Sequence, residues 1–193
     1  MSELQIVVCA DNAPWSRFGR WLGLCEYNHA LLRYFKYEKF YEEVGHAYYR
    51  TFRDVGYIIE AGFSGVVERI WHPEEYIKYA VLRLKEPCPE AGHDKMLAFA
   101  RTQVGERYGW ELLPPIIIRL LRKLIGDFMQ RPDALFVLGI ASADWLDSEI
   151  CTSLVDKTLC YGGYDLVPSQ RSALVTPDEI RHSPILEVIQ ERG

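Results

Sequence analysis

The sequence predicts an α+β domain with a central antiparallel sheet, and two observations lead to this class. Short apolar or alternating runs are concentrated in the first half, where Gly56–Ala61 and Val66–Ile70 flank Gly62-Phe63-Ser64-Gly65 as in a β-hairpin. Apolar residues at helical spacing come later, over Asp94–Val104 and again after Ile150. Because the strands are concentrated early and do not alternate with helices, we expect α+β organisation.

The first elements are a strand, a turn, a helix and a second strand. Leu4–Ala10 is apolar and rich in β-branched residues, which is typical of a buried strand. Asp11–Pro14 is a turn, and Ser16 caps a helix with an inward side of Phe18, Trp21, Leu22 and Leu24. Asn28-His29 then opens a second strand that continues to Phe35.

The middle of the chain contains strands, a helix and an insertion. Phe40–Asp54 is rich in Tyr, Glu and Arg, and we assign it no type. Tyr79–Leu84 alternates as a strand does, and Asp94–Val104 is helical with Met96, Leu97, Ala100 and Val104 on one side. A helix-rich insertion is expected at about 110–144, where Pro114, Pro115 and Pro132 break it into pieces.

A short amphipathic helix begins near Cys151, and its apolar residues are Ile150, Leu154, Val155 and Leu159. Asp147 or Ser148 can cap its start, and Gly162-Gly163 can end it. A strand near Ala173–Val175 follows. Thr176-Pro177-Asp178-Glu179 is a capping box with proline at the first helical position. We find no repeats or low-complexity linkers and expect one domain over residues 1–193.

The composition argues against several classes of binding partner and bound group. A net charge of -5 and a pI near 5.6 argue against nucleic acid as the main partner. The five cysteines form no Cys-x-x-Cys pair, so neither a zinc knuckle nor a disulfide framework is indicated. His72, His93 and His182 show no pairing typical of a metal site and are expected at the surface. We therefore expect no metal and no cofactor.

Free thiols fit a reducing compartment. The start of the chain lacks the pattern of a signal peptide. No apolar run reaches the roughly 18 residues of a membrane span. These features together predict a cytoplasmic protein.

Three residues have the chemistry of a thiol-based active site. Cys151 lies in the first turn of its helix, where free N–H groups and the positive end of the dipole lower the pKa of a thiol. His29 begins a strand, and Glu60 interrupts the apolar run of another, which is costly without a partner. Together they could form a Cys–His–acid triad. Alternatively, Cys151 is buried filler, His29 is a half-buried structural histidine and Glu60 points to solvent from an edge strand.

The order of several motifs resembles the circularly permuted papain-like cysteine hydrolases. These are the permuted branch of the NlpC-type peptidases, which includes YiiX/YebB-like proteins and, more distantly, lecithin:retinol acyltransferase. The matching segments, spread over nearly the whole chain, are Trp15–Trp21 with Asn28–Leu32, Ile59–Gly62 with Gly65-Val66, Val104–Tyr108, Cys151–Val155 and Val175–Ile180. The resemblance implies a central antiparallel sheet with the nucleophile helix packed against it. It also implies a catalytic triad of Cys151, His29 and Glu60.

The chain departs from that family in two places. The interval between His29 and Glu60 is longer than usual and contains a second candidate base, His46, at a more ordinary distance from Glu60. We favour His29 because the preceding helix fits and because it opens a clean strand. The insertion at about 110–144 is not needed by a catalytic core. For its apolar segment Ile116–Ile125 we rank three interpretations. A core or lid helix comes first, a docking face for a partner second, and an interfacial membrane helix last.

The expected function is therefore that of a cysteine peptidase or amidase that uses Cys151, His29 and Glu60 through a thioester acyl-enzyme. Its substrate would be a small peptide, amide or other acyl compound. The alternatives are a lipid acyltransferase or thioesterase of the lecithin:retinol acyltransferase type, and a non-catalytic binding module on the same fold. The sequence leaves the substrate, the acceptor and the oligomeric state open.

Overall fold

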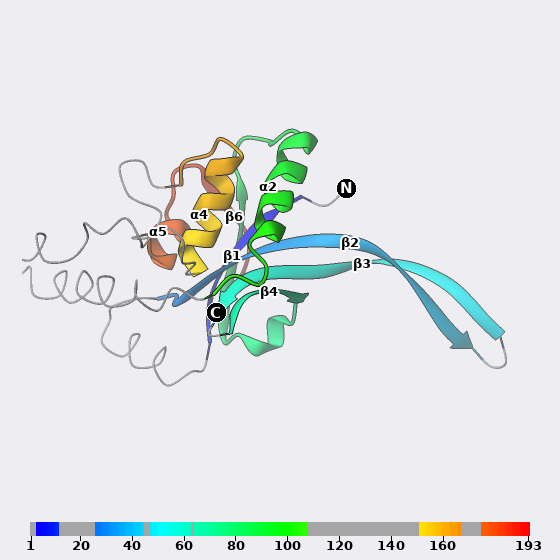
Figure 1. The fold of residues 1–193 in the computed structure, drawn as a ribbon. Helices are drawn as coiled ribbons and strands as arrows, with labels where there is room; N and C mark the ends of the chain where they lie inside the picture. Colours follow the sequence, from blue (N-terminus) through cyan, green and yellow to red (C-terminus); the bar gives the residue numbers. More distant parts are fainter. Residues whose placement is uncertain (1–2, 12–25, 45–46, 63, 108–150, 167–174) are drawn as a thin grey trace, which may run out of the picture.

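The structure is a computed structural model that describes residues 3–11, 26–44, 47–62, 64–107, 151–166 and 175–193 (Figure 1). Within these ranges the elements, in chain order, are β1 (Gln5–Ala10), β2 (His29–Val44), β3 (Ala47–Gly62), β4 (Gly65–Ile70), the 3₁₀ turn η1 (Pro73–Glu75), β5 (Lys78–Leu84), α2 (Glu90–Thr102), α4 (Cys151–Tyr161), α5 (Pro177–Arg181) and β6 (Leu186–Arg192). The expected α+β class is confirmed. The helix expected from Ser16 and the insertion at about 110–144 lie outside the described residues.

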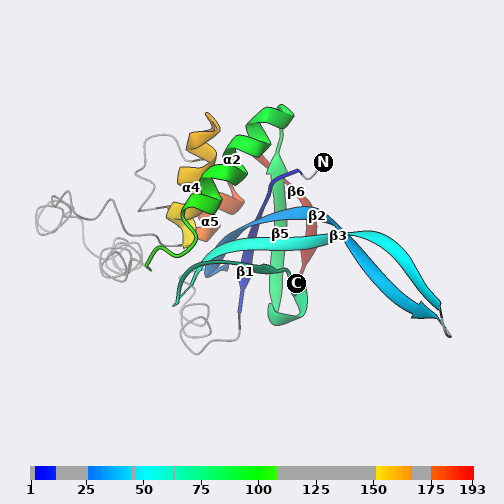
Figure 2. The same ribbon diagram turned by 45° about the vertical axis from the view of Figure 1, so that its right-hand side comes forward.

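The six strands form one antiparallel sheet in the order β4-β3-β2-β1-β5-β6. Helices α2, α4 and α5 lie on one face of this sheet, and η1 lies on the other side (Figures 1 and 2). The sheet therefore separates two packed layers.

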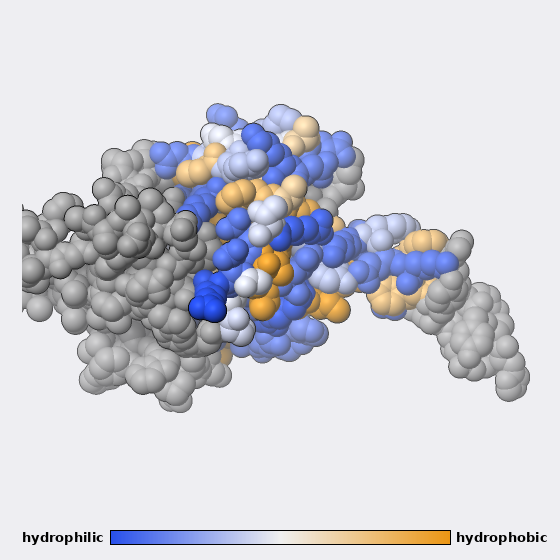
Figure 3. Space-filling model, viewed as in Figure 1, coloured by the Kyte–Doolittle hydropathy of each residue, from blue (hydrophilic) through white to orange (hydrophobic). Residues whose placement is uncertain are grey.

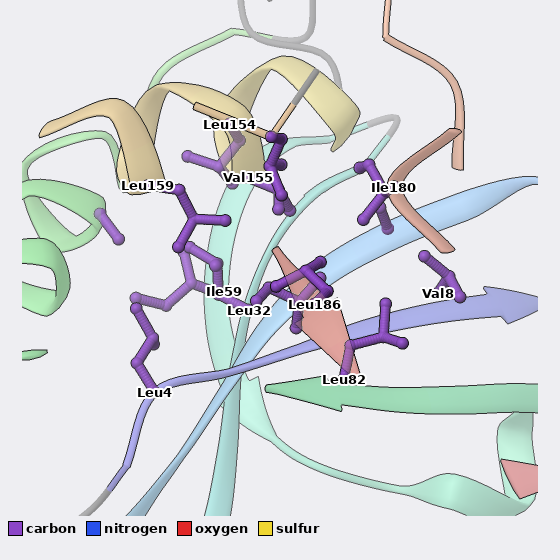
Figure 4. Packing of buried hydrophobic residues seen from close by; sticks show 14 of the residues in the cluster. Leu4, Val8, Leu32, Ile59, Leu82, Leu154, Val155, Leu159, Ile180 and Leu186 are labelled. Atoms are coloured by element: carbon purple, nitrogen blue, oxygen red, sulfur yellow. The ribbon is translucent and has the colours of Figure 1, made fainter. Parts of the chain in front are cut away.

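Both faces of the central strands are buried, which explains their continuous apolar sequence. The face under the helices holds the larger core, in which α4 residues Leu154, Val155 and Leu159 pack with Leu32 and Ile59 of the sheet (Figure 4). Successive residues point to opposite faces. The alternate positions therefore build a second cluster, formed by Val7, Cys9, Leu31, Ile58, Tyr76, Tyr79 and Val81 with Trp71 beside it.

The β2–β3 hairpin is much longer than the sheet that supports it. The pairing of β1 with β2 reaches Gln5↔Arg33, and that of β4 with β3 reaches Tyr57↔Ile70. From Lys36↔Val55 to Val44↔Ala47 the two strands pair only with each other among the described residues. We call these two segments, Lys36–Val44 and Ala47–Val55, the arm. Figure 2 shows the arm projecting from the body of the fold.

Several boundaries differ from the expectations. Phe40–Asp54, to which we assigned no type, lies within the β2–β3 hairpin, apart from residues 45 and 46, which lie outside the described residues. Strand β6 was not expected at all. Val175 lies in no strand, and the rest of the strand expected at 173–175 is outside the described residues. Val104 is exposed because α2 ends before it, at Thr102.

Glycine is required at the start of β4. Gly65 has a φ of 105°, and a Cβ atom there would lie 2.4 Å from the backbone oxygen of Glu106. Two backbone hydrogen bonds join this point to the segment after α2, from the Val66 N–H to the Glu106 oxygen at 2.9 Å and from the Gly105 N–H to the Val66 oxygen at 2.9 Å. The tight turn sets the β3–β4 register and so decides which residue of β4 faces Glu60.

None of the helices in the described ranges combines the length and the apolar character needed to cross a bilayer.

Candidate functional site

His29 is the first residue of β2, and the backbone before it is held at three points. The Asn28 N–H donates to the Cys9 oxygen at 3.1 Å. The N–H groups of Glu26 and Tyr27 donate to the carboxylate of Asp178, at 3.0 and 3.1 Å. Asp178 lies in the first turn of α5, which begins with the expected capping box of Thr176 and Glu179. The motif at 175–180 therefore positions the strand that carries His29.

Glu60 lies on β3, on the same face of the sheet as His29. The last pair of the β2–β3 ladder is Leu32↔Ile59. Because side chains alternate, Glu60 and His29 both point away from the face that Leu32 shares with Ile59. The His29 Nε2–H donates to Glu60 Oε2 at 2.8 Å. The two side chains are only 16% and 11% exposed, so this hydrogen bond is largely shielded from water.

Two further side chains hold the Glu60 carboxylate. Arg69 Nε donates to Glu60 Oε1 at 2.6 Å, and the Tyr76 hydroxyl donates to Oε2 at 3.4 Å. Burial raises the pKa of Glu60, but the hydrogen bonds and charges of His29 and Arg69 outweigh burial and lower the pKa to about 2. Glu60 is therefore ionised throughout the physiological pH range and accepts from the imidazole.

Cys151 is the first residue of α4, and its thiol is in hydrogen-bond contact with His29. Since Nε2 of His29 bonds Glu60, the other ring nitrogen, Nδ1, is left for the sulfur. The core residues of α4 hold this end of the helix against β2 and β3. Cys151 itself is buried, with 8% of its surface exposed.

The electrostatics of Cys151 and His29 favour an ion pair. Burial raises the pKa of Cys151, but the charge of His29, its hydrogen bond and the backbone N–H groups of Ala30 and Thr152 together lower it. Burial lowers the pKa of His29, but the charge and hydrogen bond of Cys151 and those of Glu60 together raise it. Both shifts act in the direction of a thiolate next to an imidazolium.

Other described cysteines have a different environment. Burial, followed by the charge of Glu60, raises the pKa of Cys9. Burial also raises the pKa of Cys160. Cys88 is a half-buried free thiol. Cys25, the remaining cysteine, lies outside the described residues. The lowered pKa of Cys151 therefore comes from its specific neighbours and is not shared by cysteines that are merely buried.

The other histidines are placed as follows. His46, the alternative base, lies outside the described residues. His72 and His182 are exposed, as expected. His93 is half-buried, less exposed than expected, and its Nδ1 accepts a hydrogen bond from the Leu4 N–H at 3.2 Å. Within the described ranges, no group of three or more His, Cys, Asp or Glu side chains is arranged to hold a metal ion.

Sequence reasoning missed Arg69 and Tyr76. A usable signal for Arg69 was present, because the hairpin pairs Gly62 with Gly65 and therefore Glu60 with Val67. The residue two positions further along the same face is Arg69, a diagonal neighbour within reach of a long side chain. No comparable local signal points to Tyr76, which comes from the connection after η1.

Comparisons of the chain with protein-family models, with curated proteins and with solved structures found no match. The functional assignment therefore rests on the geometry of the site and on the chemistry of its residues.

Proposed function

We propose that the protein is a cysteine hydrolase of the peptidase or amidase type, with Cys151 as nucleophile, His29 as general base and acid, and Glu60 as the residue that orients the imidazole. The observation that carries this proposal is the continuous chain of contacts from the Cys151 sulfur to His29 and from His29 Nε2 to Glu60 Oε2 at 2.8 Å. Cysteine nucleophiles are activated by an adjacent base that a third group orients.

The reaction would begin with attack of the Cys151 thiolate on the carbonyl carbon of an amide or ester. The tetrahedral intermediate collapses as the imidazolium of His29 donates its proton to the leaving amine or alcohol, and a thioester with Cys151 remains. Neutral His29 then takes a proton from water, which attacks the thioester and releases the acid. The second tetrahedral intermediate collapses by breaking the bond between the carbonyl carbon and the Cys151 sulfur, which leaves as the thiolate beside the imidazolium that His29 became on taking the proton of water, so atoms and charge balance.

The order of elements supports a permuted papain-like architecture. The strand that begins with His29 comes first, the strand with Glu60 follows, and the helix that begins with Cys151 comes late in the chain and packs on the same antiparallel sheet. This is the arrangement that the sequence resemblance implies. The motif at 175–180 also has a structural role, because its Asp178 accepts hydrogen bonds from the backbone N–H groups of Glu26 and Tyr27, just before His29.

A covalent acyl-enzyme on Cys151 tests the proposal. The folded protein is incubated with p-nitrophenyl acetate, release of nitrophenol is followed, and the acetylated residue is located by mass spectrometry. We expect an initial burst of nitrophenol, one acetyl group on Cys151, and loss of both in Cys151→Ala. Cys160→Ala serves as the matched control, since this exposed cysteine lies on the same helix and should leave the burst unchanged.

If acetyl groups appear only on residues other than Cys151, or if Cys151→Ala keeps the burst, the protein is not a thiol hydrolase. A non-catalytic module on this fold would give that result. If the acetyl group forms on Cys151 and water then removes it, hydrolysis is established.

A further inference from the structure

We propose that Arg69 is a positioning residue of the site, which holds the Glu60 carboxylate in the orientation and charge state that His29 requires. This inference rests on the proposed function, because it assigns a role in the same triad. It also makes the working unit a chain of five groups of alternating charge, in the order Cys151, His29, Glu60, Arg69 and Glu75.

Each donor nitrogen of Arg69 has its own partner. Nε donates to Glu60 Oε1 at 2.6 Å, Nη1 to Glu75 Oε2 at 2.7 Å and Nη2 to the Tyr76 hydroxyl at 3.1 Å. The Tyr76 hydroxyl in turn donates to Glu60 Oε2. Arg69, Tyr76 and Glu60 therefore form a closed ring of hydrogen bonds, and the planar guanidinium fixes all three directions at once.

The ring holds the Glu60 carboxylate from both sides. Arg69 binds Oε1, and His29 and Tyr76 bind Oε2. A carboxylate bound only through Oε2 could rotate about its terminal bond and still keep one hydrogen bond. With Oε1 tied to Arg69, rotation breaks a charge-assisted bond, so Oε2 stays aligned with the imidazole.

Charge is the second part of the role. Glu60 is buried, and burial by itself favours the protonated acid, which carries no negative charge to stabilise the imidazolium. Arg69 supplies a permanent positive charge on the side of the carboxylate opposite His29. Its own side chain is 33% exposed and its Nη1 reaches the half-exposed Glu75, so the positive charge is itself compensated near solvent.

The alternative is that Arg69 and Glu60 form an ion pair that serves stability alone. Removing one member of a buried pair destabilises a protein whatever its function. Loss of activity or of thermal stability in an Arg69 variant therefore does not separate the two roles. A pH profile of Cys151 reactivity separates them, because a purely structural pair would not move it in protein that remains folded.

The experiment measures the rate of iodoacetamide alkylation of Cys151 between pH 4 and 8, by mass spectrometry, at a temperature where circular dichroism shows each variant folded. We compare wild type, Arg69→Met, which keeps the stem but removes charge and donors, and Arg69→Lys, which keeps the charge. Arg83→Met is the matched control, because Arg83 bonds Glu187 through its Nε at 2.6 Å on a strand remote from Cys151.

In Arg69→Met we expect the acidic limb of the profile to move upward by about one pH unit, the size of effect that an opposite charge has on a nearby ionisable group. Loss of the positive charge and of the donors leaves the Glu60 carboxylate less ionised and less well aligned, which disfavours the His29 imidazolium and therefore the Cys151 thiolate. Arg69→Lys should restore part of the shift, and Arg83→Met should match wild type.

The double variant Glu60→Gln/Arg69→Met completes the test. If Arg69 acts through Glu60, its replacement adds little to the shift already caused by Glu60→Gln. Unchanged profiles in Arg69→Met and Arg69→Lys, or fully additive shifts in the double variant, would overturn the inference. If Arg69→Met fails to fold, Arg69→Lys provides the test. Lysine keeps the charge but lacks the several planar donors of arginine, so a pH profile identical to wild type in this variant would contradict a positioning role. Failure of the proposed function gives a different result. In that case Cys151 of the wild-type protein is itself alkylated at low pH no faster than an ordinary thiol.

Discussion

The two ends of the β2–β3 hairpin are built from the same pair of strands but have opposite characters. At the body end, His29 and Glu60 lie among neighbouring strands, and their polar atoms are bonded to one another and to Arg69. In the arm, the strands pair only with each other among the described residues. The hairpin therefore combines a buried, hydrogen-bonded site with a ribbon that depends on its own cross-strand contacts.

The contacts in the arm are of a weaker kind. Tyr37 and Phe52 stack with ring centroids 5.3 Å apart, yet they are 71% and 46% exposed. Arg53 lies over the ring of Phe40 at 4.4 Å. Figure 3 shows polar and apolar residues interspersed on the visible face of the arm. Exposed pairs of this type contribute about 1 kcal/mol or less each, and a two-stranded ribbon alone is marginally stable.

The comparison teaches that polar residues become chemically useful where neighbouring elements exclude water. Glu60 interrupts an apolar run at the body end, and its pKa is strongly shifted because burial strengthens the fields of His29 and Arg69. A charged residue of the arm such as Arg53 lies in solvent, where interactions of the same length are screened.

The largest expected effect comes from replacing the two candidate bases, one at a time, with alanine. His29→Ala should lower the rate of Cys151 alkylation at pH 6 by roughly 100-fold, because the thiol loses the charge and hydrogen bond that keep it ionised. His46→Ala should stay within about twofold of wild type. Rates come from mass spectrometry of the folded proteins. The reverse result would make His46 the base.

An intermediate effect is expected for acid stability. The pKa of Glu60 is about 2 in the folded protein against an ordinary value of 4.5, so its ionised form stabilises the fold above about pH 4.5 and this contribution is lost as the pH falls toward 2. Urea unfolding at steps from pH 6 to 2.5 should therefore show a steeper loss of free energy in wild type than in Glu60→Gln. Phe52→Ala, on the exposed arm, should lower the free energy of unfolding by the same amount at every pH, so that its slope against pH does not change. Parallel curves for wild type and Glu60→Gln would contradict the shifted pKa.

The smallest effect is expected from shortening the arm. Replacing residues 40–51 with Asn-Gly joins Lys39 to its pairing partner Phe52 through a two-residue turn of the type favoured in hairpins. We expect Cys151 alkylation within about twofold of wild type, since the body end keeps all of its bonded neighbours. This variant also lacks His46. A large loss of reactivity would show that the arm belongs to the site and would end the contrast between the two ends of the hairpin.

Much of the local structure could be predicted from the sequence. Apolar runs and turn residues predicted β1, β4 and β5 to within a few residues, and the capping box at Thr176 was confirmed with both of its hydrogen bonds. The helix of Cys151 was confirmed together with its buried residues Leu154 and Val155. Papain-like permutation, a single domain and cytoplasmic location stay predictions.

The long hairpin and β6 could not be predicted in the same way. At residues 36–40 and 51–55 of the arm the side chains are exposed or half-buried, and the sequence pattern of Tyr, Glu and Arg gives neither the helical nor the strand period clearly. The last strand has only its first residue, Leu186, buried, and it is held by pairing with β5 at the edge of the sheet. Both elements owe their form to a partner strand distant in sequence.

The sequence by itself determined the short buried strands β1, β4 and β5, the helix that begins at Cys151 and the capping box of α5. These properties depend on spacing and capping, which act over a few residues. Only the tertiary structure decided that Cys151 contacts His29, that Glu60 meets Arg69 and Tyr76, and which way the pKa values move. Those outcomes depend on burial and on contacts between β2, β3, β4 and α4, which form only when the distant segments pack together.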